Sequence, residues 1–264
     1  MAGPTTAQRG EAERADTPAR PPHIGPQGRR LTGRTRLVLA AVGLVLTAAA
    51  TVWVLYGSSW LRLERVTTTG TDVLTRSEVE AAAAAPVGSP LISVDTGAIA
   101  DRLRQKLPRI DSVDVVRSWP HGVGLKVTER KPVLLVEKGA KFIEVDAKGV
   151  RFATVDKAPP RVPLLELTPD QSASLRRFGS DRLLREAVRV AGDLPGQVAR
   201  EARTVRVTSY DSTVLELTRG RTVMWGSSEE GLVKARVLSA LMKASPKAGH
   251  FDVSAPTAPA VSKS

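Results

Sequence analysis

The chain of 264 residues contains no cysteine and only three histidines. The lack of cysteine excludes a disulfide framework, a thiolate zinc site, an iron–sulfur cluster and a cysteine nucleophile. Three histidines are barely enough for a histidine metal site. Neither a nucleophile elbow, a zincin motif, a Walker A loop nor a dinucleotide fingerprint occurs in the sequence. We therefore expect no catalytic residue, no metal, no cofactor and no small-molecule substrate, and a protein that is not an enzyme.

Aromatic residues are also scarce, at 4% of the chain. A core must therefore be built from Val, Leu, Ile and Ala, and platforms for stacking nucleic-acid bases are not expected. Negative charge is in deficit, because 39 Lys and Arg face 27 Asp and Glu, which gives a net charge of +12. Such an excess favours an anionic neighbour. We expect the membrane surface or the cell wall, rather than nucleic acid, to be that neighbour.

A long uncharged run is present at residues 37–56. Its 20 residues would span about 30 Å as a helix, which is the thickness of a bilayer core. A buried core helix would need a polar face, and only Thr47 and Thr51 offer one. A cleaved signal peptide is the stronger alternative, because residues 48–50 resemble a cleavage site. The apolar run continues past that site to Leu55, so an uncleaved transmembrane helix is favoured.

The charges around this run predict its orientation. Residues 1–36 are rich in Pro, Gly and Arg and are predicted to be a disordered tail. The tail carries five arginines and no acid between residues 20 and 36, which places it in the cytoplasm. Arg34 and Arg36 would then lie at the inner membrane interface, and Trp53 and Tyr56 at the outer one. The rest of the chain would lie outside the cytoplasmic (inner) cell membrane.

Two folded units are expected after the span, and together they indicate an α+β fold. Residues 61–130 show the order strand, helix, helix, strand, strand, with a capping box at Thr75 and Glu78 and a second helix capped by Asp95. Residues 131–255 are richer in strands and contain two helices, the second capped by Ser227. Their last strand is expected at residues 250–254. Residues 256–264 are predicted to be a disordered tail.

Several segments of the chain, in the order in which they occur, are similar to the bacterial cell-division family FtsQ, also called DivIB. The segments that carry this resemblance are residues 66–70, Gly88-Ser89-Pro90-Leu91, Val113 to Pro120, Thr128 to Pro132, Val145 to Val150, Gly220 to Gly226 and Phe251-Asp252-Val253-Ser254. The resemblance implies that residues 61–130 form a POTRA domain and that residues 131–255 form a β domain. It also implies a non-enzymatic scaffold at the division septum, which links early division components to septal wall synthesis.

The same resemblance implies a partner. FtsQ-like proteins hold the membrane-anchored FtsB and FtsL pair, and the last strand of the β domain with its neighbouring helix is where FtsB is implied to pair by strand addition. The positions of this chain that would bind the partner are Phe251, Val253 and Ser254, with the strand residues Thr222, Met224 and Trp225. A charge at Phe251 is predicted to weaken binding without unfolding the domain. Pro256 and Pro259 are expected to stop the ladder there.

Two other functions remain open on the sequence. One is a POTRA-containing transport or chaperone protein of the cell envelope, although too little chain follows the first unit to form a β-barrel. The other is a membrane-tethered wall hydrolase, which would have to use His121 or His250 as its base.

Overall fold

The computed structural model describes residues 33–167 and 179–263, so most of the predicted N-terminal tail lies outside the described residues. The helix α1 (Gly33–Gly57) is 25 residues long, and none of its residues is buried. Its most apolar window has a mean hydropathy of 2.4, so its length and composition suffice to cross a membrane. The hydroxyls of Thr47 and Thr51 each donate to the carbonyl oxygen four residues earlier, at 2.8 Å. Their polar atoms are therefore satisfied inside the helix, as an apolar environment requires.

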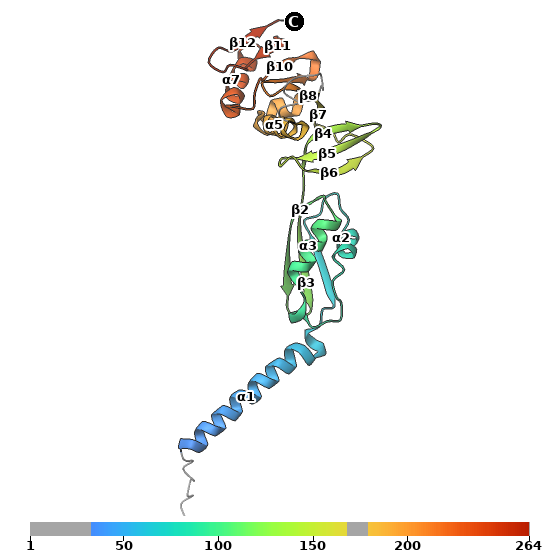
Figure 1. The fold of residues 1–264 in the computed structure, drawn as a ribbon, viewed down its shortest axis with the longest axis vertical. Helices are drawn as coiled ribbons and strands as arrows, with labels where there is room; N and C mark the ends of the chain where they lie inside the picture. The colour runs from blue at the N-terminus through green and yellow to red at the C-terminus, as the bar shows by residue number, and fades with distance from the viewer. Residues whose placement is uncertain (1–32, 168–178, 264) are drawn as a thin grey trace, which may run out of the picture. The chain divides into compact units, whose positions relative to one another are not determined.

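The first folded unit has the predicted order of elements (Figure 1). In chain order these are β1 (Arg65–Thr69), α2 (Arg76–Ala83), α3 (Thr96–Lys106), β2 (Ile110–Ser118) and β3 (Gly122–Glu129). The strand β3 is central, and it runs parallel to β1 and antiparallel to β2. The helices α2 and α3 bury Val79, Ile99 and Leu103 in one core with the apolar side chains of the sheet.

Both helices of this unit begin at the predicted caps. The Thr75 hydroxyl accepts a hydrogen bond from the Glu78 backbone N–H at 3.2 Å, and the Glu78 carboxylate accepts one from the Thr75 N–H at 2.8 Å. The bond from the Thr75 N–H, and a second one from the Thr75 hydroxyl at 2.7 Å, hold the pKa of the Glu78 carboxylate below its usual value. The Asp95 carboxylate accepts from the Ala98 N–H at 2.9 Å. Each cap thus satisfies backbone donors that a helix start otherwise leaves open.

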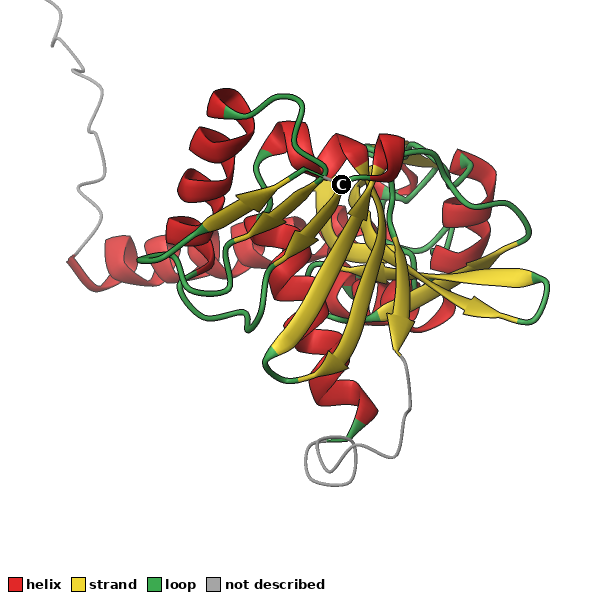
Figure 2. Ribbon diagram, turned by 90° about the horizontal axis from the view of Figure 1, so that it is seen from above, coloured by secondary structure: helices red, strands yellow, loops and turns green. Residues whose placement is uncertain are grey.

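The second unit is built on one nine-stranded sheet, whose strands are yellow in Figure 2. Its strands are β4 (Pro132–Lys138), β5 (Lys141–Asp146), β6 (Arg151–Val155), β7 (Leu164–Leu167), β8 (Ala202–Ser209), β9 (Ser212–Leu217), β10 (Thr222–Met224), β11 (His250–Asp252) and β12 (Ala260–Ser262). Their spatial order is β12-β11-β10-β9-β8-β7-β4-β5-β6. Within the described part of this unit, three α-helices accompany the strands, α5 (Ser180–Asp193), α6 (Gly196–Glu201) and α7 (Gly231–Ala244). The core joins Leu183 and Leu184 of α5 and Leu238 of α7 to the sheet.

Three features of this unit differ from the sequence-based expectation. The residues 256–264, expected to be disordered, contain the strand β12, because both prolines precede the strand rather than interrupt it. The helix α6 was not expected. Ser227 does not cap α7, whose N-cap is Glu230 in a left-handed conformation with φ of 54°. The Ser227 carbonyl instead accepts a hydrogen bond from the buried Lys234 ammonium at 3.0 Å.

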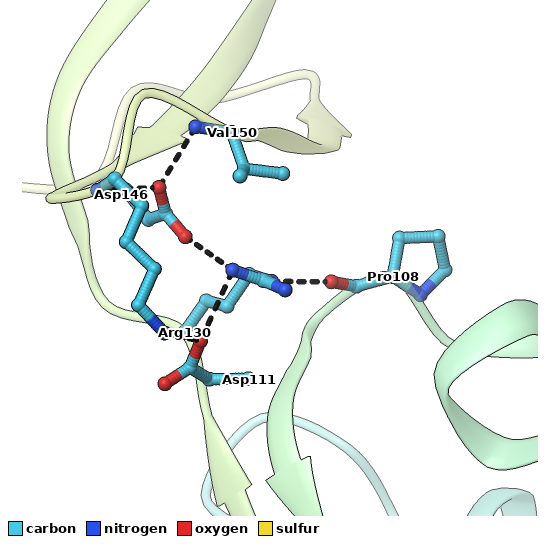
Figure 3. Close-up of polar contacts among 6 residues, drawn as sticks. Pro108, Asp111, Arg130, Asp146 and Val150 are labelled. Carbon is cyan, nitrogen blue, oxygen red and sulfur yellow. Dashed lines mark hydrogen bonds and ion pairs between the residues drawn. The ribbon is translucent and has the colours of Figure 1, made fainter. Parts of the chain in front are cut away.

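Charged side chains join the two folded units across the short connection between β3 and β4. Figure 3 shows Arg130, in that connection, pairing with the carboxylates of Asp146 and Asp111, the latter at 3.1 Å. Its Nε also donates to the carbonyl oxygen of Pro108 at 3.0 Å. Asp146 accepts two further bonds from backbone N–H groups of the turn that follows β5, one of them that of Val150 at 2.8 Å. The side chains of Arg130 and Asp146 are only 16% and 6% exposed.

A second buried pair lies beside the first. The Arg109 guanidinium contacts the Glu144 carboxylate at 2.6 Å, and both side chains are largely buried. The same guanidinium lies over the ring of Phe152, at 5.2 Å from its centroid. The two units are therefore held by charge pairs that water reaches poorly, and such pairs are specific in geometry. We call Arg109, Arg130, Asp111, Glu144 and Asp146 the junction cluster.

Candidate partner-binding edge

The sheet of the second unit has an open edge at β12. The strand β12 pairs antiparallel with β11, and β11 pairs parallel with β10, to which it is connected through α7. No strand of the described residues lies on the other side of β12. Its outward backbone N–H and C=O groups are therefore a template on which an extended segment from another chain can pair.

Three of the predicted partner-binding residues are part of the core instead. Phe251, Val253 and Trp225 have no exposed surface. Phe251 lies opposite Val223 on one side and Val261 on the other, so β11 is an interior strand and not the edge. A charge at Phe251 would have to be buried without a partner, and we now expect it to unfold the domain. The strand to which the family resemblance assigned partner binding is thus a core strand.

The other three predicted residues lie closer to the surface. Thr222 and Met224 are half-buried, and the Thr222 hydroxyl lies 2.8 Å from Nδ1 of His250. Ser254 is exposed, and its hydroxyl donates to the Asp252 carboxylate at 2.7 Å. Ser254 is thus the one predicted residue whose side chain a partner could reach without repacking.

A cavity of about 350 Å³ lies beside β12, at residues that the sequence analysis missed. Residues of β12 and the residue after it form part of its wall, and the segment after α7 forms the rest. Its lining residues are Ser245, Pro246, Lys247, Ala248, Val261, Ser262 and Lys263. The only signal in the sequence was one valine between small residues in a Pro-rich stretch. The lining of the cavity thus combines apolar side chains with those of two lysines.

The first turn of α7 also exposes apolar side chains. Leu232 and Val233 are 65% and 45% exposed. Leu232 lines a shallow hollow of about 400 Å³ together with Pro195, where α6 begins. Lys234 differs from its neighbours because its side chain points inward, and burial lowers the pKa of its ammonium. Exposed apolar side chains that gather at one place on a surface are typical of an interaction surface.

The predicted membrane-interface residues lie near the two ends of α1. Arg34 and Arg36 belong to its first turn, while Trp53 and Tyr56 belong to its last and are 69% and 54% exposed. The charged residues are thus separated by an uncharged stretch from the aromatic ones, as in a membrane-spanning helix.

Neither histidine considered for catalysis lies in a catalytic arrangement. Nδ1 of His121 is 3.1 Å from the backbone oxygen of Trp60, and His250 contacts Thr222. Among residues 33–167 and 179–263, no group of three or more His, Asp or Glu side chains could hold a metal ion.

Comparison with known proteins decides the family. The family model of the FtsQ-type POTRA domain matches residues 61–130. The chain is 64% identical to the cell division protein FtsQ of Streptomyces venezuelae, over 100% of this chain and 99% of that protein. The chain belongs to the FtsQ family. FtsQ of Streptomyces griseus is 77% identical over 79% of this chain and 100% of its own length. FtsQ of Mycobacterium tuberculosis is 30% identical over 96% of this chain and 76% of that protein.

A solved structure was also found, that of the major extracytoplasmic domain of DivIB from Geobacillus stearothermophilus. The match covers 44% of this chain and 94% of the DivIB chain, with 15% sequence identity and a TM-score of 0.34. The family assignment rests on the FtsQ relatives and on the POTRA match. This chain is thus a cell division protein with an FtsQ-type POTRA domain, a strand-rich second unit and one candidate transmembrane helix. Membership of this family disfavours both the transport protein and the wall hydrolase.

Proposed function

We propose that this FtsQ-family protein is a non-catalytic scaffold of the division septum, anchored in the cytoplasmic membrane by α1. The arginines that precede α1 support a cytoplasmic N-terminus, because positive flanks are retained on that side. Both folded units then lie outside. The scaffold would connect early division components to septal wall synthesis through protein contacts alone.

We further propose that a membrane-anchored FtsB/FtsL-like partner pairs with β12 by strand addition. The open edge of β12 is the observation that carries this proposal. The family resemblance implies pairing at the last strand, and the last strand of this chain is β12 rather than β11. The side chains of β12 are exposed or half-buried, and the exposed face of α7 belongs to the same end of the chain.

The surroundings of β12 define the chemistry of the partner segment. The cavity beside Val261 can accept one apolar side chain, and burying it would contribute about 1.5 to 3 kcal/mol. Lys247 and Lys263, which line the cavity, favour acidic residues on the partner. We therefore expect an extended segment in which an apolar residue is flanked by carboxylates.

A cysteine scan tests strand addition, because the chain has no cysteine of its own. Single cysteines at the exposed positions Ala260 and Ser262 would be combined with single cysteines along the partner segment, and disulfide formation would be measured in membranes. Strand addition predicts that each position crosslinks to a short window of the partner. When the cysteine moves from residue 260 to residue 262, the crosslinked window should move toward the N-terminus of the partner segment if the strands pair antiparallel. It should move toward the C-terminus of that segment if they pair parallel.

The matched control is Thr154→Cys, an exposed residue of β6, which is the opposite edge strand of the same sheet. It should not crosslink with the partner. Equal crosslinking from β6 and β12, or crosslinks spread over the whole partner segment, would contradict pairing at β12.

A further inference from the structure

The connection between α1 and the first folded unit is short. The helix ends at Gly57, while Leu61 is 8% exposed and Leu63 is fully buried in the core of that unit. Four residue steps can extend over about 14 Å at most. If α1 spans the membrane, the part of the unit that holds Leu61 must therefore lie close to the bilayer surface. This argument rests on the proposed membrane placement of α1.

Hydrogen bonds define which part of the unit this is. The backbone oxygen of Trp60 lies 3.1 Å from Nδ1 of His121, and the N–H of Glu64 donates to the His121 backbone oxygen at 2.9 Å. On the other side, Leu63 N–H donates to the carbonyl oxygen of Ser89 at 2.9 Å. The turn between β2 and β3 and the loop before residue 90 are thus bound directly to the entering chain. We call this part the entry end of the POTRA unit.

The entry end exposes large apolar side chains. Trp60 is 65% exposed, Val87 is 65% exposed and Trp119, in the turn after β2, is 50% exposed. Val116, two residues before the end of β2, is 56% exposed. The fifth exposed large apolar residue of the described unit, Val73, lies at the opposite end, where its N–H donates to the carboxylate of Glu129. Four of the five are therefore gathered where the chain enters.

The charge of the entry end fits the headgroups of anionic lipids. Arg62 and Arg65 are exposed there, and Glu64 is the acidic residue between them. The Arg62 guanidinium donates to the carbonyl oxygen of Gly88 at 3.0 Å, which places this cation next to the exposed Val87. Arginine next to tryptophan at a membrane surface is favourable, because the indole occupies the interfacial layer and the cation reaches the phosphates.

We propose that the entry end is a lipid-binding surface, with Trp60, Val87 and Trp119 seated in the interfacial layer of the membrane that α1 spans. The POTRA unit is then held at the bilayer by two attachments, its covalent link to α1 and the Trp119 turn. The strand β2 leads from this surface to the junction cluster. Its nine residues extend over about 27 Å, so the second unit begins that far along the strand from the lipid.

Tryptophan quenching by brominated lipid tests the proposal on the full chain. The chain has four tryptophans, and Trp225 is fully buried in the second unit. A variant with Trp53→Phe and Trp60→Phe keeps Trp119 and Trp225, and adding Trp119→Phe keeps Trp225 alone. Both would be placed in vesicles of phosphatidylcholine and phosphatidylglycerol, with and without dibrominated phosphatidylcholine. We expect brominated lipid to reduce the emission of the first variant and to leave the second unchanged.

Two outcomes would overturn the proposal. Trp119 emission that resists brominated lipid but falls with aqueous acrylamide would show that the turn faces water. Emission that resists both quenchers would show that protein covers the turn. A third variant, with Trp60→Phe and Trp119→Phe, reports α1 through Trp53. If brominated lipid quenches Trp53 but not Trp119, lipid binding by the entry end is refuted while the membrane placement of α1 stands. If it quenches neither tryptophan, the membrane placement of α1 is refuted as well.

Discussion

The substitution Asp146→Asn tests whether the junction cluster holds the two folded units together. Asp146 is 6% exposed and faces Arg130, which is 16% exposed. Asparagine keeps the size of the side chain and one acceptor for the backbone N–H groups of the turn. It removes the charge, however, and leaves the Arg130 guanidinium with less compensation in a poorly hydrated place.

The expected loss in the free energy of unfolding depends on the contacts that Arg130 keeps in the variant. Removing one partner of a buried ion pair costs about 3 to 5 kcal/mol when the other charge is left alone. Arg130 still has Asp111 at 3.1 Å and the Pro108 carbonyl oxygen at 3.0 Å. We therefore expect a smaller loss of about 2 to 3 kcal/mol in the free energy of unfolding, since those two contacts remain.

Urea unfolding of the full chain in detergent would measure this loss, with Trp225 reporting the second unit. The matched control is Asp156→Asn, which breaks the exposed pair between Lys141 and Asp156. An exposed pair contributes at most about 1 kcal/mol. If Asp146→Asn destabilises the protein no more than Asp156→Asn does, the junction cluster does not stabilise the fold and the reasoning is refuted.

Three further predictions concern other parts of the structure. Phe251→Ala should lower the free energy of unfolding by about 3 to 5 kcal/mol through the cavity it creates, and a thermal melt that does not change would contradict its burial. Gly70→Ala should destabilise by more than about 1 kcal/mol, because φ is 82° and the new Cβ would collide with a backbone carbonyl oxygen of β3; Gly88→Ala, with φ of 88° and open space, should cost less. The hydrogen bond from Lys148 holds the pKa of Asp111 below its usual value. The stability that this carboxylate contributes is therefore complete above the ordinary pKa of about 3.9, and it is lost as the pH falls through the lowered pKa. Asp111→Asn should flatten the stability curve in that acidic window, and an unchanged curve would refute the assignment.

Local signals in the sequence were sufficient for the first unit. The caps at Thr75 and Asp95 use only side chains within three residues of the backbone groups they satisfy, so a sequence pattern identifies them. Ser227 had the same local pattern but does not cap α7, because its surroundings are decided by contacts between distant segments. The neighbouring Ser228 hydroxyl donates to Glu186 of α5, 42 residues away in the chain.

The binding edge shows why the candidate site could be predicted only in part. The apolar alternation around Phe251 predicts a strand, but the edge of a sheet is a property of strand order, which local sequence does not contain. The strand β12 has three residues, and what holds it is pairing with β11 and the packing of Val261 against the core. Predicting the C-terminal end of the sheet was therefore possible, whereas choosing between β11 and β12 was not.

The strand order of the nine-stranded sheet places the junction cluster and the proposed partner-binding edge far from each other. The junction cluster uses β5 and its following turn, while the proposed partner edge is β12, seven strand positions away. At about 4.8 Å per position, this is a separation of about 34 Å. Substitutions so far apart act independently on the free energy of unfolding. The partner edge can therefore change in evolution to follow a changing partner, while the junction keeps its charge pairs without any compensating substitution.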